Sequence, residues 1–317
     1  MIQTGEFDFA WGLAGLDKDV VARLEQHGRK GAFLFTPSSR LWHIQLNRTD
    51  PWTEVEGERS SVKVPHPFFT DLRVRQAFAA AVDRRAILEL DATGQLTSNV
   101  LNAPTQFQSP NTHWEFNLDK AARLLEQAGW QRGSDGVRVK DGRRMQVVYQ
   151  SEVNLSQQRG QALVKKALER LGVEVELKAI NSSVWYSSDP GNPDTASHFY
   201  ADMQQTIMRY DLDPQRYMAR FVSWEIAQKA NNWAGQNIVR WVNAAYDRLW
   251  KEAATELDPV KRAALFMRMN DLLIEDVVVI PVVWDHNMSA VSHSLRGLEL
   301  GPWDWHLWNL AYWYREP

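Results

Sequence analysis

The chain has 317 residues, with 36 lysines and arginines against 39 aspartates and glutamates and a formal net charge of −3. Its length allows about two domains of ordinary size, and its hydrophobic content of 44% excludes a disordered or low-complexity chain. The near-neutral charge gives no electrostatic footprint for nucleic acid, so we expect no nucleic-acid partner.

The rarest residue types exclude several kinds of site. Cysteine is absent, which excludes disulfides and any cysteine-ligated metal. No two histidines stand four residues apart, so none share one side of a helix turn, and we expect no metal and no cofactor. No apolar run reaches the roughly 20 residues of a membrane-spanning helix. The first residues also lack the basic and apolar regions of a signal peptide.

The first part of the chain has the pattern of an α/β protein. Residues 5–13 alternate acidic and apolar side chains and predict a short strand, and a helical period follows at Val20, Val21 and Leu24. Residues 41–47 alternate again and end in a polar turn that contains Asp50-Pro51. We place a crossing between domains at this second strand.

Two helices follow, each with a polar cap. Asp71 caps a predicted helix over 72–90, whose apolar residues recur at helical spacing. A second helix is predicted over 119–128, with Asn117 as its cap and a glycine after its end.

The next segment predicts a sheet covered by helices. Residues 136–149 form a predicted hairpin, because Asp141-Gly142 supplies the positive-φ turn between two β-rich runs. A helix from Ser156 to Gly172 and an alternating strand over 173–180 then complete a strand, helix, strand order. This βαβ order predicts a parallel or mixed sheet.

The stretch from 181 to 235 shows little periodicity and is rich in proline and aromatic residues. A long irregular segment inside a domain is usually functional, so we expect ligand contacts there. Helices are predicted again over 242–255 and from Asp258-Pro259, followed by a strand over 277–284.

Catalytic motifs are missing, and we expect no enzyme. The chain has no G-x-S-x-G, G-x-x-x-x-G-K-[ST], G-x-G-x-x-G or H-E-x-x-H. Carboxylate pairs such as Asp211 and Asp213, together with 15 tryptophans that suit sugar stacking, leave a glycan-acting hydrolase as one alternative. A module that uses its aromatic surface to bind other proteins is a second alternative.

One motif resembles a known family. Residues 71–84 match the pattern D-x-R-V-R-Q-A-x-x-x-A-V-D-R, which resembles the signature of family 5 extracellular solute-binding proteins. These are the dipeptide and oligopeptide receptors of ABC importers. Residues 5–8, 42–47, 119–130 and 280–282 are similar to further segments of the family in the same order.

The resemblance implies an α/β fold of the type II periplasmic-binding-protein kind, with two lobes that close on a ligand about a hinge. Residues 42–284 are then one complete lobe with both crossing strands, at 42–47 and 280–284. Residues 1–41 and 285–317 belong to the other lobe. Met1 corresponds to the middle of family chains, so we expect an export signal upstream and a periplasmic or cell-surface location.

The implied function is that of a solute-binding subunit of an ABC importer. It captures a small polar organic ligand, a peptide or peptide-like molecule, and acts as a monomer with the membrane subunits as partners. Peptide receptors of the family hold the ligand's amino group with an aspartate just before an acidic-Pro turn. Here Asp211 takes that place with a one-residue gap and Tyr210 without it. An opine, a sugar or another polar solute therefore stays open.

The predicted ligand contacts lie in or beside the irregular stretch. Indoles stack on the ligand, Asp211 pairs with a cationic group and Arg240 pairs with an anionic group. The full set is Trp185, Tyr210, Asp211, Trp233, Asn237, Arg240 and Trp241.

Overall fold

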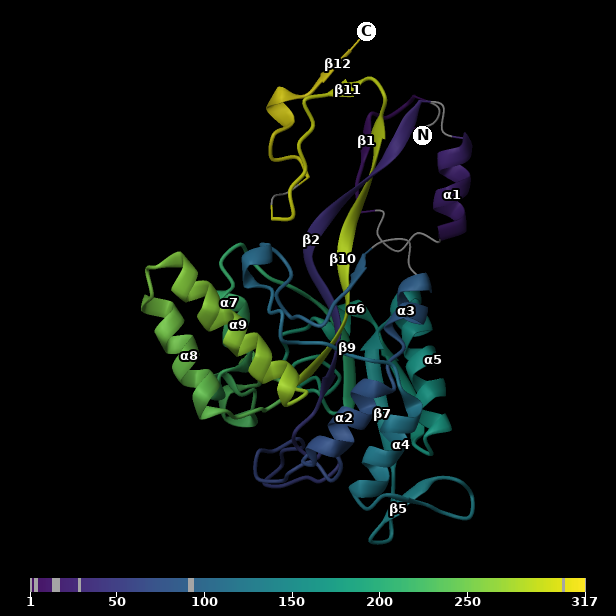
Figure 1. Cartoon of the computed structure of the whole chain (residues 1–317), viewed down its shortest axis with the longest axis vertical. Helices are drawn as coiled ribbons and strands as arrows, with labels where there is room; N and C mark the ends of the chain where they lie inside the picture. The colour runs from purple at the N-terminus through teal and green to yellow at the C-terminus, as the bar shows by residue number, and fades with distance from the viewer. Residues whose placement is uncertain are drawn as a thin grey trace.

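The structure is a computed structural model that describes residues 2, 5–12, 18–27, 30–90, 94–303 and 306–316. A mixed sheet runs through it in the order β1-β10-β2-β9-β7-β8, and β3 also pairs with β10. Most helices surround the lower half of the sheet, while β1, α1 and the C-terminal segment accompany its upper extension (Figure 1). This α/β arrangement agrees with the fold class predicted above.

The strands of the main sheet are β1 (Phe9–Ala10), β2 (Gly31–Leu46), β3 (Gln95–Leu96), β7 (Gln146–Glu152), β8 (Glu174–Ile180), β9 (Met203–Arg209) and β10 (Val279–Ser292). Two small sheets contain β4 (Gln131–Arg132), β5 (Arg138–Lys140), β6 (Arg143–Arg144), β11 (Leu295–Arg296) and β12 (Tyr314–Arg315). The helices are α1 (Lys18–His27), α2 (Leu72–Ala80), α3 (Arg84–Leu90), α4 (Leu118–Gln127), α5 (Leu155–Arg170), α6 (Ser182–Trp185), α7 (Gln215–Met218), α8 (Ala244–Thr255) and α9 (Pro259–Glu275). Among the described residues, no helix has both the length and the apolar character needed to cross a membrane.

The two longest strands, β2 and β10, form one antiparallel pair. Their lower halves are buried, and their upper halves project away from the helices (Figure 1). Ile280 pairs with Ile44, and Val291 pairs with Ala32. The predicted crossing segments 42–47 and 280–284 therefore lie side by side. Both strands are longer than predicted, because each continues through the expected domain boundary without a turn.

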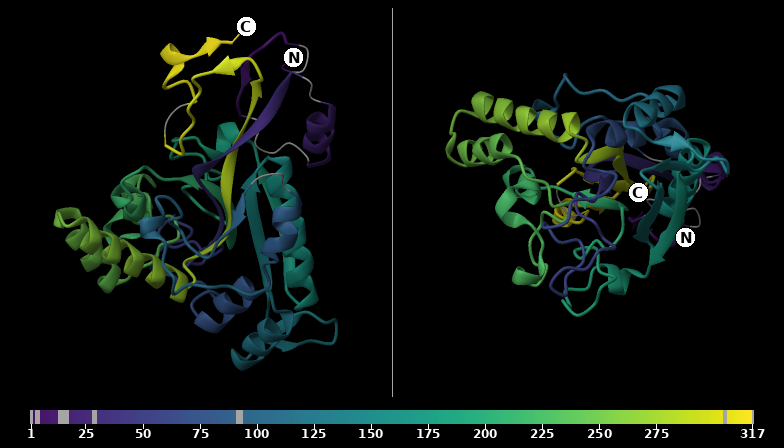
Figure 2. Two further views of the ribbon diagram at one scale, coloured as in Figure 1. Left: turned by 45° about the horizontal axis from the view of Figure 1, so that its top comes forward. Right: turned by 90° about the horizontal axis from the view of Figure 1, so that it is seen from below.

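Two hydrophobic cores lie on opposite faces of the sheet. Successive side chains of a strand point to opposite faces, so Trp42 and Ile44 enter one core while Leu41 enters the other. The first core contains residues of α2, α3, α4 and α5, and the second contains residues of α8 and α9. Figure 2 shows the two groups of helices on the two sides of the β2–β10 pair.

The α5 helix approaches β2 more closely than a side chain would permit. A Cβ atom at Gly160 would lie 2.4 Å from the outer edge of the Trp42 indole. Glycine costs a helix interior roughly 1 kcal/mol relative to alanine. Gly160 therefore lowers the intrinsic stability of α5 but allows the helix to pack closely against Trp42 of β2.

The strand–helix–strand prediction is confirmed. β7 and β8 are parallel neighbours joined through α5, with Gln146 opposite Glu174 and Glu152 opposite Ile180. The Asp141-Gly142 turn is also confirmed, since both residues have positive φ between β5 and β6. β7, however, leaves the hairpin and joins the main sheet.

Three predicted elements differ in the structure. The helix over 72–90 is two helices, because the Asp83 side chain accepts the Ala86 N–H and starts a new helix, α3. The irregular stretch 181–235 contains a central strand, β9, between β2 and β7. The first strand covers only Phe9–Ala10, and residue 13 of that prediction lies outside the described residues.

The strand β9 was not predicted, because its polar residues are buried. Gln204 and Gln205 are inaccessible to solvent, so the strand has no polar, solvated face to give an alternating pattern. The Gln204 amide donates to Gln45 and accepts from Gln150, while Gln205 accepts from the Tyr149 hydroxyl at 2.7 Å. These bonds satisfy the buried amides and tie β9 to both neighbours.

Asp276, just after α9, holds three elements together. Its carboxylate pairs with Arg75 of α2 and lies 2.9 Å from Arg48 Nη2, just after β2. The indole N–H of Trp241 donates to the same carboxylate at 2.6 Å. Burial lowers the pKa of Arg48 to about 9, and the neighbouring Arg75 charge contributes to the decrease. Asp276 is therefore the countercharge for two buried guanidinium groups.

We predict that Asp276→Asn lowers the free energy of unfolding by on the order of 3 kcal/mol, because it leaves two largely buried cations without a countercharge. Urea denaturation at pH 7 measures the change. The control is Glu275→Gln, which removes an exposed partner of Arg268 and should cost less than about 1 kcal/mol. Equal losses in both variants would contradict this account of Asp276.

A second prediction concerns His43, which is inaccessible to solvent on β2. Burial lowers the pKa of His43 to about 4, so the unfolded chain binds a proton between pH 6.5 and 4 that the folded chain does not. The folded chain therefore keeps its full stability with respect to His43 above pH 6.5 and loses stability as the pH falls toward 4. We expect a loss of about 2 kcal/mol from this residue between pH 7 and pH 5.

Urea denaturation of the native chain and of His43→Gln at both pH values tests this prediction. The variant should show a smaller difference between pH 7 and pH 5 than the native chain. The same substitution at the exposed His113 should leave the difference unchanged. Burial also lowers the pKa values of His198 and His286, so part of the pH dependence should remain in His43→Gln.

Candidate functional site

A cavity of about 290 Å³ lies beside the middle of the β2–β10 pair. Residues of both crossing strands, the end of β9 and both terminal segments meet there. Its lining comprises Trp11, Gly12, Ser38, Ser39, Arg40, Arg209, Asn287, Met288, Pro302, Trp303 and His306. We call it the crossing cavity.

Two guanidinium groups give the crossing cavity a positive wall. Arg40 Nη2 lies 3.0 Å from Asp285 Oδ2, whereas Arg40 Nε is buried without an acceptor. Arg209 closes β9, and no hydrogen bond or ion pair of its side chain occurs within the described residues. Burial lowers the pKa of Arg209, and the neighbouring Arg40 charge lowers it further. Two cations thus face one carboxylate.

Aromatic rings form a second wall of the crossing cavity. Trp11 stacks on His306 with ring centroids 6.2 Å apart and an interplanar angle of 20°. Trp303 contacts Tyr210 at 5.8 Å. Burial lowers the pKa of His306, and the Arg209 charge adds to this effect, so both favour the neutral imidazole. Flat, largely apolar surfaces therefore lie beside the cationic wall.

The strands fix the base of the crossing cavity through hydrogen bonds across a register shift. The Ser38 hydroxyl donates to the Asp285 carbonyl at 2.8 Å, and the Trp284 indole donates to the Ser38 carbonyl at 2.6 Å. The register of β10 against β2 shifts between Trp284 and His286, where Pro37 supplies no N–H. The Arg40 backbone N–H also donates to the Ser38 hydroxyl, so these contacts hold the backbone of Arg40.

This combination suits a small organic anion. A guanidinium group binds a carboxylate through paired N–H donors, and aromatic faces bind planar or apolar parts of a ligand. Among the described lining residues, no serine hydroxyl is hydrogen-bonded to a histidine or a carboxylate, and the Ser38 hydroxyl donates to the Asp285 carbonyl.

Of the predicted ligand contacts, Tyr210 and Asp211 lie nearest to the crossing cavity. The Tyr210 N–H donates to the Ser39 carbonyl, and its hydroxyl accepts from the N–H groups of Asn102 and Ala103, each at 3.0 Å. Burial raises the pKa of Tyr210 to about 12. Tyr210 thus supports the cavity from behind, through Trp303, whereas Asp211 is exposed at the end of β9.

The other predicted contacts lie away from the crossing cavity. Asn237 is inaccessible and donates to the Trp241 carbonyl, and Arg240 donates to the carbonyls of Ile238 and His198. The Trp233 ring lies 4.1 Å from the His198 ring. Trp185, at the end of α6, is 1% exposed. The structure thus groups Trp233 and Arg240 around His198 and joins Asn237 to Trp241, while Trp185 stands apart.

Ligand contact by this predicted set stays a prediction. All but Trp233 and Asp211 are buried, and four of the buried side chains have hydrogen-bond partners within the chain: Tyr210, Asn237, Arg240 and Trp241. Burial lowers the pKa of Arg240 to about 10, and within the described residues its guanidinium donates to two backbone carbonyls.

Five lining residues of the crossing cavity were not predicted as site residues from the sequence: Arg40, Arg209, Trp11, Trp303 and His306. Arg40 and Arg209 are paired across β2 and β9, so only the register of an unpredicted strand brings them together. The sequence near these two arginines offered one indication: Arg40 directly precedes the predicted crossing strand, and Arg209 directly precedes Tyr210, a predicted ligand contact.

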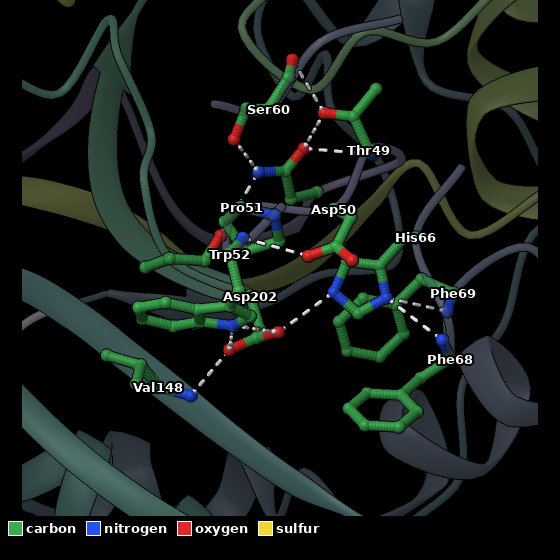
Figure 3. Close-up of polar contacts among 12 residues, drawn as sticks. Thr49, Asp50, Pro51, Trp52, Ser60, His66, Phe68, Phe69, Val148 and Asp202 are labelled. Atoms are coloured by element: carbon green, nitrogen blue, oxygen red, sulfur yellow. Dashed lines mark hydrogen bonds and ion pairs between the residues drawn. The ribbon is translucent and has the colours of Figure 1, made fainter. Parts of the chain in front are cut away.

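A separate buried group combines a histidine with an aspartate, two residue types common in catalytic sites (Figure 3). Asp202 is inaccessible and accepts from His66 Nε2 at 2.9 Å, from the Val148 N–H and from the Trp52 indole. His66 Nδ1 accepts from the N–H groups of Phe68 and Phe69.

Both nitrogens of His66 are therefore occupied: Nε2 carries the proton donated to Asp202, and the lone pair on Nδ1 already accepts two backbone N–H groups, so it is not free to take a proton from a nucleophile. The group instead fixes the segment after β2 onto β7. Asn47 extends this anchoring by donating to the Ser60 hydroxyl and to the carbonyls of Phe199 and Ala201.

The carboxylate pair of the hydrolase alternative is on the surface. Asp213 accepts from Arg262, and Asp211 lies outside the lining of the crossing cavity. Among the described residues, no group of three or more histidines and carboxylates is arranged to hold a metal ion.

Comparison with known sequences places most of this chain in one family. Residues 1–227 match the sequence model of the bacterial extracellular solute-binding proteins, family 5 middle. The oligopeptide-binding protein AppA of Bacillus subtilis is 24% identical over 257 residues, which are 78% of this chain and 44% of that protein. A dipeptide-binding protein of Pseudomonas aeruginosa is 24% identical over 243 residues, which are 75% of this chain and 42% of the relative. The chain thus spans less than half the length of these relatives.

Solved structures have the same fold. The oligopeptide-binding protein from Thermus thermophilus complexed with a pentapeptide matches with a TM-score of 0.78 and 23% identity, over 99% of this chain and 52% of that one. AppA from Bacillus subtilis in complex with a nonapeptide gives a TM-score of 0.76 and 22% identity, over 100% of this chain and 57% of that one. The predicted type II periplasmic-binding-protein fold is confirmed.

Proposed function

The chain belongs to the bacterial extracellular solute-binding proteins of family 5, and on that premise we propose that it is the ligand-capturing part of an ABC importer's receptor. The observation that carries the proposal is the crossing cavity, where a cationic wall and an aromatic wall meet at the paired strands β2 and β10. A receptor of this kind binds its solute and releases it unchanged.

We propose that the solute is a small polar organic molecule with a carboxylate, such as a short peptide or a peptide-like compound. Arg209 binds the carboxylate, because its guanidinium makes no hydrogen bond or ion pair within the described part of the chain. The rings of Trp11 and Trp303 contact the rest of the ligand. The named ligands of the relatives, oligopeptides and dipeptides, support this choice.

We propose that residues 42–284 form one lobe and that 1–41 and 285–317 belong to a second. Three observations support the division. The β2–β10 pair joins the two parts (Figure 1), the two cores pack against the lower half of this pair, and the aromatic wall comes from the terminal segments. Bending of this pair closes the aromatic wall onto Arg40 and Arg209.

The proposed receptor acts in the periplasm or at the cell surface and delivers its solute to the membrane subunits of the importer as a monomer. Family membership supports an extracytoplasmic location. Asp211 and Trp233 remain proposed contacts that reach the ligand when the lobes close.

The experiment is isothermal titration calorimetry of the 317-residue chain with a tripeptide library, comparing free C-terminal carboxylates with their amides. We expect saturable binding of at least one acid form. Binding should weaken about tenfold or more in Arg209→Gln, because a charge-assisted pair is lost. The control Arg143→Gln removes an exposed arginine that lies outside the crossing cavity.

Two results would contradict the proposal. One is the absence of binding across peptides, opines and sugars by a folded chain. The other is equal affinity for acids and amides in the native chain and in Arg209→Gln, which would remove the carboxylate contact. Hydrolysis of the bound peptide would contradict the assignment of a receptor without chemistry.

A further inference from the structure

A second cavity, of about 580 Å³, lies where α3 begins, next to β3 and the segment 112–116. None of its described lining residues also lines the crossing cavity. Arg84 and Trp114 are among its lining residues, and we call it the Arg84 cavity. β3 pairs with β10 at Val283 and Trp284, so this cavity borders the crossing strand from its other edge.

Arg84 is buried without a countercharge. Its side chain is 7% exposed, and the described residues provide no carboxylate within ion-pair distance of it. Nε donates to the Pro281 carbonyl at 2.7 Å and Nη1 to the Val82 carbonyl at 3.4 Å, while Nη2 has no acceptor. Burial alone lowers the pKa of Arg84 to about 9. A buried cation without a partner is costly and is uncommon in folded proteins.

Trp114 contributes a second unpaired donor to the same wall. The Arg84 guanidinium carbon lies 5.3 Å from the centroid of the Trp114 ring, so the cation rests on the indole. The indole Nε1 is buried and also has no acceptor. Almost all buried N–H groups in proteins have an acceptor, so two donors left over in one cavity wall point to a missing group.

The remaining lining gives the Arg84 cavity a positive balance. Arg85 is exposed and makes no ion pair within the described residues, and His113 lies nearby in the lining. Asp83 is the acidic residue of the lining, and its carboxylate accepts the Ala86 N–H. Hydroxyl groups of Thr97, Ser98 and Thr112 add further polar atoms.

We propose that the Arg84 cavity binds a small oxyanion, a carboxylate or an inorganic anion such as sulfate. An oxygen of the anion accepts hydrogen bonds from Arg84 Nη2 and Trp114 Nε1, and Arg85 adds long-range attraction. Both donor nitrogens are covered by neighbouring atoms, so the anion enters when the half-buried Trp114 ring shifts. The bound anion provides the countercharge that Arg84 lacks.

The site has a mechanical connection to the crossing strand. Arg84 Nε holds the Pro281 carbonyl at the point where the register of β10 shifts against β2, between Pro281 and Val283. An anion that fixes the guanidinium therefore also fixes this irregular point of β10. We expect the anion to stabilise the folded chain.

The test is a titration of the ¹⁵N-tryptophan-labelled chain with sodium sulfate and, separately, with sodium acetate, each at an ionic strength held constant with sodium chloride. The indole resonance absent from Trp114→Phe identifies Trp114. We expect this resonance to move saturably with at least one oxyanion. Sulfate and acetate distinguish an inorganic anion from a carboxylate.

Three variants test whether the movement of the Trp114 resonance reports binding in the Arg84 cavity. Arg84→Gln should weaken the oxyanion affinity about tenfold or more, because it removes the buried charge. Arg85→Gln, an exposed substitution that leaves the buried contacts in place, should weaken it by a smaller factor. Arg143→Gln, which removes an exposed charge outside the cavity, should leave the affinity unchanged.

The proposal is overturned if the Trp114 resonance stays in place with both oxyanions. Equal movement with sodium chloride alone would also overturn it. If Arg84→Gln does not fold, Arg85→Gln against Arg143→Gln decides, because equal affinities in these two variants would contradict an anion in this cavity. The test is independent of peptide binding, so its result does not depend on the proposed receptor function.

Discussion

The antiparallel pairing of β2 with β10 is the constraint on which the rest of the structure depends. These strands come from distant parts of the chain, and their side chains alternate between two cores. A shift of one residue in their register would exchange the faces of Leu41 and Trp42 and disrupt both cores at once. The same register places Arg40 beside Asp285 and thereby forms the base of the crossing cavity.

Buried polar contacts fix this pairing from outside the strands. Asp276 forms ion pairs with Arg48 and Arg75 where α9 leads into β10, and Asp202 with His66 fixes the segment after β2. Hydrophobic burial is not directional, whereas these hydrogen bonds require particular partners at particular distances. The polar groups therefore specify one arrangement of elements that the apolar cores stabilise.

Elements that depend on neighbouring residues in the chain could be predicted from the sequence. Elements that depend on contacts between distant residues could not. Asn117 and Asp258 cap α4 and α9 as their positions indicated, because a cap depends on the next three residues only. β9 was missed, since Gln204 and Gln205 find partners on strands that are remote in sequence. The cavity-lining pair Arg40 and Arg209 was missed for the same reason: the register of β9 brings them together.

The aromatic residues show why composition alone did not locate the site. An indole is suited both to packing and to ligand contact, and its environment decides between these roles. Trp241 donates to Asp276 inside the fold, whereas Trp303 contacts the buried Tyr210 and also lines the crossing cavity. Because Tyr210 is held by the backbone of Asn102 and Ala103, Trp303 rests on a fixed support. Binding surfaces are most effective when such supports hold their contact residues, because less freedom is then lost when the ligand arrives.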